Sequence, residues 1–224
     1  MIVLSPRLQT AADLCRRGVT VCDVGTDHAY LACYLAQNGA KQVIASDVRE
    51  GPLEAARRTI AQQGVSNVAA VLSDGLEKID YADDVVICGM GGELIAKIIS
   101  GCRFLSEDTR FILQPMTKAE VLRRELYAGG FEIVEERTAR EGGRLYTVML
   151  VKFTGIIQQP DELFCLCGKI TDPDMLRSIS MKLRKNAAGI EKARTQPGDN
   201  DLRSAQLAQR LRSLAEQVDR YSEV

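Results

Sequence analysis

The periodicity of the apolar residues changes once along the chain, and this change constrains the fold more than any other feature. From residue 1 to about 153, short apolar runs alternate with stretches of helical periodicity. This alternation is typical of a parallel sheet with helical crossovers. From about residue 160 to 224 the pattern is helical only. We therefore predict an α/β domain over residues 1–155, followed by a helical hairpin over residues 156–224.

The first region predicts five strand–helix repeats and a terminal hairpin. Strands are expected at residues 19–24, 43–46, 68–72, 85–88 and 111–113. Helices are expected at residues 5–18, 28–38, 52–63, 94–101 and 117–129, the last opened by a capping box from Thr117 to Glu120. Two further runs, 131–137 and 144–153, flank a Gly-Gly turn and predict a hairpin. We expect a mostly parallel sheet whose last strand is antiparallel.

Two heptad-like runs make up the second region. Mostly apolar residues repeat at spacings of three and four, first at Leu176, Ile179, Leu183, Asn186, Ile190 and Ala193, and then at Leu207, Leu211, Leu214, Val218 and Tyr221. The turn residues Gln196-Pro197-Gly198 separate the runs, so we expect an antiparallel coiled-coil hairpin. The first helix is basic on its remaining faces, including Arg177, Lys182 and Lys185. These cations form either a solvated face or a surface that follows phosphates.

Composition narrows the classes of protein that need to be considered. The formal net charge is −1, so any nucleic-acid surface must be a local patch. The seven cysteines are scattered and include no CxxC pair. This pattern predicts buried free thiols in a protein of a reducing compartment. His28 is the single histidine. With no signal peptide and no membrane-spanning run, we expect a cytoplasmic protein without a metal, and we favour a monomer.

The first strand leads directly into a turn that predicts a ligand site. Asp23 lies near the end of the strand, and Gly25 allows close approach of the backbone to a ligand. The dinucleotide fingerprint would place its second glycine where this chain has Asp27. A carboxylate there repels a pyrophosphate but accepts hydrogen bonds from an ammonium group. The turn therefore disfavours NAD and favours S-adenosylmethionine.

Acidic residues also follow the next two strands. Asp47 can accept from the ribose hydroxyls of a nucleoside, and Asp74 from the exocyclic amine of adenine. Each alone could be a helix cap or turn residue. Three such residues after three consecutive strands favour a nucleoside site.

A glycine-rich segment, Cys88 to Gly92, follows the fourth strand and suits backbone packed against a ligand. It lacks the Asn/Asp-Pro-Pro-Tyr tetrapeptide of methyltransferases that act on exocyclic amines. Ring nitrogen, oxygen and carbon acceptors therefore remain open. Gln114-Pro115, after the fifth strand, either contributes an amide to the same cleft or forms a plain turn.

Four segments together carry a family resemblance. They are Ser5-Pro-Arg-Leu-Gln-Thr, Asp23-Val-Gly-Thr-Asp-His-Ala-Tyr-Leu, Ile87-Cys-Gly-Met-Gly-Gly and Leu113-Gln-Pro. In this order they resemble the bacterial tRNA adenine-N1 methyltransferases of the TrmK family, which modify adenine 22. The match spans most of residues 4–153, and the helical hairpin fits the family's C-terminal coiled coil. Met116 departs from the family, which typically has Asn after Gln-Pro.

The resemblance implies a class I, Rossmann-like methyltransferase fold that uses S-adenosylmethionine and acts on tRNA. Asp27 matches the family's catalytic aspartate. The implied cofactor site consists of Asp23, Gly25, Thr26, Asp27, His28, Leu31, Asp47, Val48, Asp74, Gly75, Gly89, Met90 and Gly91. The implied tRNA contacts are Arg7, Tyr30, Gln114, Arg177, Lys182 and Lys185. Tyr30 and Met90 could pack on the face of the target base or lie in the core.

Two other functions remain open from the sequence. One is a nicotinamide-dependent oxidoreductase, which Asp47 fits and the missing second glycine does not. The other is a non-catalytic RNA-binding module with a vestigial cofactor pocket.

Overall fold

The computed structural model describes residues 2–194 and 202–221, which divide into two compact units, residues 1–160 and 161–224. The first unit contains a seven-stranded sheet in the order β3-β2-β1-β4-β5-β7-β6. Its strands are β1 (Thr20–Val24), β2 (Gln42–Asp47), β3 (Val68–Leu72), β4 (Asp84–Gly91), β5 (Arg110–Thr117), β6 (Phe131–Glu141) and β7 (Arg144–Phe153). The pairs among β1–β5 are parallel, and β7 runs antiparallel to both β5 and β6. The expected Rossmann-like methyltransferase sheet is confirmed.

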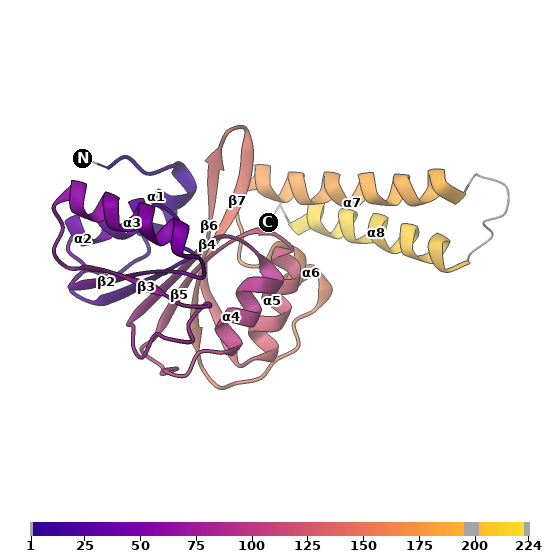
Figure 1. Ribbon diagram of the computed structural model, residues 1–224. Coiled ribbons are helices and arrows are strands. Elements are labelled where there is room, and N and C mark those ends of the chain that lie inside the picture. The colour runs from indigo at the N-terminus through magenta and orange to yellow at the C-terminus, as the bar shows by residue number, and fades with distance from the viewer. Residues whose placement is uncertain (1, 195–201, 222–224) are drawn as a thin grey trace. The chain divides into compact units, whose positions relative to one another are not determined.

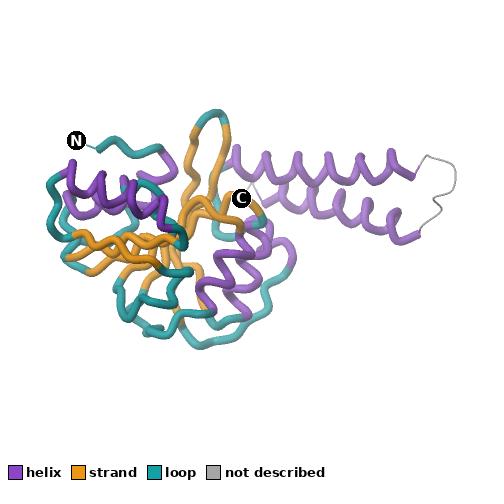
Figure 2. The backbone as a smooth tube through the Cα atoms, viewed as in Figure 1, coloured by secondary structure: helices purple, strands orange, loops and turns teal. Residues whose placement is uncertain are grey.

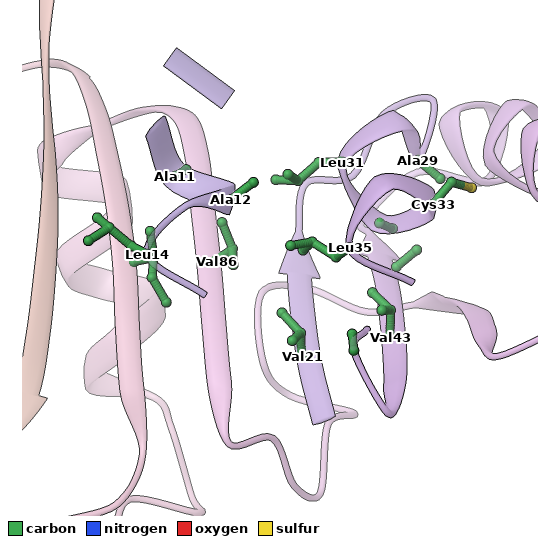
Figure 3. Close-up of a cluster of buried hydrophobic side chains, with 14 of the residues drawn as sticks. Ala11, Ala12, Leu14, Val21, Ala29, Leu31, Cys33, Leu35, Val43 and Val86 are labelled. Atoms are coloured by element: carbon green, nitrogen blue, oxygen red, sulfur yellow. The ribbon is translucent and has the colours of Figure 1, made fainter. Parts of the chain in front are cut away.

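Helices cover both faces of this sheet (Figures 1 and 2). They are α1 (Pro6–Ala12), α2 (Tyr30–Gln37), α3 (Glu50–Gln63), α4 (Gly92–Ser100) and α5 (Ala119–Ala128). The first three helices pack on one face, where Ala11, Leu31, Leu35, Val21 and Val86 belong to one buried cluster (Figure 3). Burial of these apolar side chains fixes α1 and α2 against the strands whose ends form the site.

The terminal hairpin forms because two glycines occupy its turn. Gly142 and Gly143 have φ values of +57° and +73°, and Glu141 pairs with Arg144 across the ladder. Positive φ at both central residues is the requirement of a type I′ turn, which matches the twist of the strands. The sequence expectation of a hairpin here is confirmed, and its turn brings Glu141 to the end of β6.

Several local expectations were wrong. The first helix ends at Ala12 rather than at Gly18, and α2 begins at Tyr30 rather than at residue 28. Thr117 does not cap α5, because it lies in β5 and Lys118 takes the N-cap position in the left-handed region.

The connection from β3 to β4 has no crossover helix, and none is predicted between residues 72 and 85. Residues 73–83 are all described and contain turns but no helix. Leu76, Ile79 and Ala82 are buried along this connection. Burial of these three apolar side chains stabilises the connection without a helix.

The second unit consists of α6 (Glu162–Cys167), α7 (Pro173–Arg194) and α8 (Leu202–Tyr221). Ion pairs join Arg184 on α7 to Asp219 on α8, and Glu191 on α7 to Arg212 on α8. Residues later in α7 therefore pair with residues earlier in α8. This register makes α7 and α8 an antiparallel pair. The expected Pro-Gly turn at residues 196–198 lies outside the described residues.

The apolar seam of this helix pair differs in detail from the sequence pattern. Leu176, Leu183, Leu214 and Val218 are buried as expected, but Asn186 is exposed and Ala187 is buried beside it. On α8, Leu207 and Tyr221 are largely exposed, and Ala208 and Ala215 are buried. Small residues therefore occupy part of the contact between the helices. None of the helices described is both long and apolar enough to cross a membrane.

Candidate active site

The carboxyl ends of β1 and β4 meet the first helix at a cavity of about 290 Å³. Ligands of doubly wound sheets bind at this edge. The cavity is lined by Arg7, Leu8, Asp23, Gly25, Thr26, Asp27, His28, Tyr30, Leu31, Cys88 and Gly89. The structure thus brings together nine of the expected cofactor and substrate residues, which come from α1, β1, the β1–α2 loop, α2 and β4.

Asp23 is the buried carboxylate of the cavity. It is 4% exposed, and it accepts a hydrogen bond of 2.7 Å from Oγ1 of Thr26. Burial raises the pKa of Asp23 from 3.8 to about 6; hydrogen bonds from Thr26 and the Ala32 backbone oppose this rise, and the charge of Asp47 adds to it. A buried carboxylate with a raised pKa favours a cationic ligand group, which would compensate the charge.

The loop between β1 and α2 has an unusual backbone. Gly25, Asp27 and Ala29 all have positive φ, at +76°, +51° and +56°. The backbone N–H groups of Gly25 and Thr26 both donate to the Ser46 carbonyl oxygen, at 2.8 and 2.9 Å, and anchor the loop to β2. A non-glycine residue in the left-handed region typically costs about 1–3 kcal/mol and is concentrated at functional sites. Because of this turn, α2 starts two residues later than its sequence pattern predicts.

The same loop presents Asp27, His28 and Tyr30 to solvent. The Asp27 side chain is 71% exposed, and its Oδ2 lies 3.8 Å from Nε2 of His28. The rings of His28 and Tyr30 stack with centroids 5.9 Å apart and an angle of 29° between their planes. Tyr30 is 52% exposed and is therefore not a core residue. An accessible carboxylate beside an exposed aromatic pair can bind a planar, hydrogen-bonding group.

The side-chain amide of Gln114 on β5 links two residues that line the cavity, Gly89 and Arg7. Oε1 of Gln114 accepts from the Gly89 N–H and from Nη1 of Arg7, each at 3.1 Å. Gly89 has a φ of +81°, and a Cβ there would lie 3.6 Å from Nη1 of Arg7. Gln114 is fully buried and lies within β5, so it is not a turn residue.

Met90 occupies the space that Gly25 leaves open. A Cβ on Gly25 would collide with the terminal methyl of Met90. The sequence predicts close approach of a ligand to the Gly25 backbone at this point. In the structure, the flexible side chain of Met90 in β4 occupies the space that a side chain at position 25 would need. Glycine at position 25 therefore allows the β1–α2 loop to pack against β4.

The remaining expected cofactor residues are not among those that line the cavity. Asp47 is buried at the end of β2 and accepts from the Arg49 N–H at 3.0 Å. Val48 is 58% exposed, and Asp74 is exposed after β3. Gly75, with a φ of +55°, packs against Ile98. Gly91 ends β4 next to Thr117.

Three site residues were missed by the sequence reasoning. Leu8 and Cys88 line the cavity, and Glu141 accepts from the Arg7 N–H at 3.2 Å and from its Nε at 3.4 Å. Leu8 follows Arg7 on the first helix, so its position was a usable signal, whereas Glu141 is 134 residues away. Burial raises the pKa of the Cys88 thiol, which keeps it protonated.

The expected tRNA contacts Arg177, Lys182 and Lys185 are exposed on α7 in the second unit. All seven cysteines are free. No group of three or more histidine, cysteine, aspartate or glutamate side chains within the described ranges is arranged to hold a metal ion.

Comparisons with known proteins place the chain in a family. A family model described as a methyltransferase domain matches residues 4–149. The tRNA (adenine(22)-N(1))-methyltransferase of Bacillus subtilis (strain 168) is 32% identical, over 99% of this chain and 96% of that protein. The chain belongs to the tRNA (adenine(22)-N(1))-methyltransferase family.

Solved structures agree with this family membership. The crystal structure of the B. subtilis m1A22 tRNA methyltransferase TrmK has a TM-score of 0.78 and 28% identity, with coverage of 98% of this chain and 100% of that chain. The Streptococcus pneumoniae protein Sp1610, solved in complex with S-adenosyl-L-methionine, has a TM-score of 0.80 and 30% identity, with coverage of 97% and 100%. These tRNA methyltransferase relatives lend no support to an oxidoreductase or to a non-catalytic RNA-binding module.

Proposed function

We propose that the chain transfers a methyl group from S-adenosylmethionine to N1 of adenine 22 in tRNA. The observation that carries this proposal is the pairing of two different carboxylates in one cavity, the buried Asp23 and the exposed Asp27. The first suits a cofactor cation and the second suits an incoming base. Family membership supplies the identity of the base and its position.

The residues present fit S-adenosylmethionine. Asp23 would accept from the ammonium group, Asp47 from the ribose hydroxyls and Asp74 from the adenine amine, with exposed Val48 beside the ring. The cavity is at the lower end of the usual volume range for small-molecule sites, so it suits the methionine end of the cofactor. The nucleoside end would lie along the open edge formed by β2 and β3.

The reaction places few demands on proton transfer. S-adenosylmethionine supplies a methyl group that is already activated by the positive sulfur. The lone pair of adenine N1 forms the new bond as the carbon–sulfur bond breaks, so no proton needs to be removed first. The ring then carries a positive charge. Asp27 would accept a hydrogen bond from the N6 amine and stabilise that charge as it develops.

The His28–Tyr30 pair gives the base a surface on which to stack. N1 lies on the Watson–Crick edge, so the target adenine must be unpaired or swung out of its stack. Aromatic side chains typically receive such bases. The half-exposed, stacked rings of His28 and Tyr30 at the cavity rim suit that role. Met116 offers no amide to the base, so recognition of the N6 amine would fall to Asp27.

The second unit would add contacts to the tRNA backbone. Lys182 and Lys185 are exposed on α7, while Arg184 and Arg212 are engaged in ion pairs between the helices. Arg177 pairs with Asp174 at 3.6 Å but keeps most of its surface. Exposed cations spaced along one helix suit phosphates, and the paired arginines suit a structural role. We expect the enzyme to act in the cytoplasm as a monomer.

Methyl transfer to unmodified tRNA tests the proposal. The protein is incubated with labelled S-adenosylmethionine and bulk unmodified tRNA, and the RNA is digested to nucleosides. We expect the label in 1-methyladenosine. Label in N6-methyladenosine would contradict the assignment of the acceptor atom, and absence of label with cofactor bound would favour a non-catalytic module.

A further inference from the structure

Gln114 has the contacts of a positioning residue. It is fully buried, and its Oε1 accepts two hydrogen bonds while its Nε2 donates to the Pro115 carbonyl oxygen at 3.0 Å and to Sδ of Met116 at 3.6 Å. A buried amide with every donor and acceptor engaged fixes its partners strongly, because loss of one contact leaves the others unsatisfied. The two groups fixed by Oε1 are the Gly89 backbone and the Arg7 guanidinium.

Arg7 is the arginine of the cavity, and it is held from two sides. Glu141 accepts from its backbone N–H and from Nε, and Gln114 accepts from Nη1. Within the described residues no hydrogen bond engages its Nη2. Arg7 lines the cavity with a quarter of its side chain exposed. One nitrogen of a fixed guanidinium therefore remains available for a ligand acceptor.

The position of Arg7 in the fold places it away from the contacts expected for the nucleoside half of the cofactor. Its partners, Gln114 and Glu141, lie on β5 and β6. Asp23 and Asp47 instead lie at the ends of β1 and β2, and Asp74 follows β3. The sheet order separates these two groups of strands into two halves. The cationic group thus lies on the side of the cavity opposite the expected nucleoside half of the cofactor.

We propose that Arg7 binds an RNA phosphate next to the target adenine, and that Gln114 acts as the positioning residue that aims it. This inference rests on the proposed function. Guanidinium groups recognise phosphates through fixed N–H donors. Gln114 itself touches neither RNA nor cofactor, and its contribution to RNA affinity passes through Arg7.

A double-mutant cycle on tRNA affinity without cofactor tests both parts. The variants are Arg7→Ala, Gln114→Met and the two combined, with exposed Arg58→Ala on α3 as the matched control for loss of an arginine. We expect each single variant to weaken tRNA binding about tenfold, the typical loss for a charged hydrogen bond. We expect the combined variant to be no weaker than Arg7→Ala, and Arg58→Ala to match the wild type. The slope of log tRNA affinity against log salt concentration should be shallower in Arg7→Ala, by the amount that corresponds to about one phosphate contact.

Gln114→Glu provides the rescue. Its side chain can still accept from Gly89 and Arg7, and when protonated it can also donate to Pro115. We expect tRNA affinity within about threefold of the wild type, whereas Gln114→Met lacks the acceptor. If Gln114→Met fails to fold, Arg7→Ala together with Gln114→Glu still tests the phosphate contact and the acceptor.

Three results would overturn the inference. Additive losses in the cycle would mean that Gln114 does not act through Arg7. If the salt dependence of tRNA affinity were the same in Arg7→Ala as in the wild type, Arg7 would not bind a phosphate. Weaker S-adenosylhomocysteine binding with unchanged tRNA affinity would place the guanidinium on the cofactor carboxylate instead. Methylation of tRNA by the wild-type protein is measured alongside the variants. If the wild type methylates tRNA, any of these three results contradicts only the role of Arg7 and Gln114 and leaves the proposed function intact.

Discussion

Cofactor affinity should fall in acid because of Asp23. Burial raises the pKa of this carboxyl to about 6, and only its ionised form attracts the ammonium group of the cofactor. At pH 5, about one molecule in eleven has Asp23 ionised, against nearly all at pH 8. Apparent affinity scales with that fraction, so we expect binding to be about tenfold weaker at pH 5 than at pH 8.

The substitution Asp23→Asn should separate binding from stability. Asn keeps an acceptor for Thr26 but carries no charge, so we expect about tenfold or weaker cofactor binding at pH 8 and little change with pH. The unliganded variant should also be more stable than the wild type at pH 8. The pKa of Asp23 is raised from 3.8 in the unfolded chain to about 6 in the folded protein. Above pH 6 the ionised carboxyl therefore lowers the free energy of unfolding by up to about 3 kcal/mol, and this loss disappears below the unfolded-state pKa.

Calorimetry with S-adenosylhomocysteine from pH 5 to pH 8 measures the first effect, and urea unfolding at both pH values measures the second. His28→Gln is the control, because it removes the single imidazole from the same cavity and leaves Asp23 in place. A pH dependence that persists in Asp23→Asn and disappears in His28→Gln would refute the reasoning.

Three further variants, two single and one double, test the remaining predicted contacts. Asp27→Asn keeps shape but removes charge, so the single-turnover rate at saturating cofactor should fall about tenfold or more; a mutant that needs more cofactor yet reaches the wild-type rate would make Asp27 only a cofactor ligand. Asp47→Ala should weaken cofactor binding about tenfold by calorimetry through loss of the ribose acceptor, and unchanged affinity would exclude that contact. The pair Lys182→Ala and Lys185→Ala should lower tRNA affinity and its salt slope while sparing cofactor binding; equal tRNA affinity at the same salt would leave α7 a structural role.

The sheet was predictable because its signals are local. Alternating apolar runs marked the strands, and Gly142 with Gly143 marked the hairpin turn through the φ values that only glycine adopts readily. The acidic residue after each of three strands was visible for the same reason, since parallel strands end at one edge of the sheet.

The missed features depend on contacts between distant segments. For Gln114 the sequence left open an amide in the cleft or a plain turn, and only its contacts with Arg7 and Gly89 on other elements decide between them. Likewise, Thr117 satisfied a capping pattern, yet pairing with β4 drew it into β5. Tertiary pairing therefore overrode local propensity at these positions.

Methylation of a single defined tRNA tests the central claim most directly. Two unmodified transcripts that differ only at position 22, one with adenine and one with guanine, are incubated with the protein and S-adenosylmethionine. Reverse transcription, which stops at a methylated Watson–Crick edge, then locates the product. The account predicts a stop at position 22 in the adenine transcript and none in the guanine transcript. Equal methylation of both transcripts, or a stop at another adenine, would contradict it.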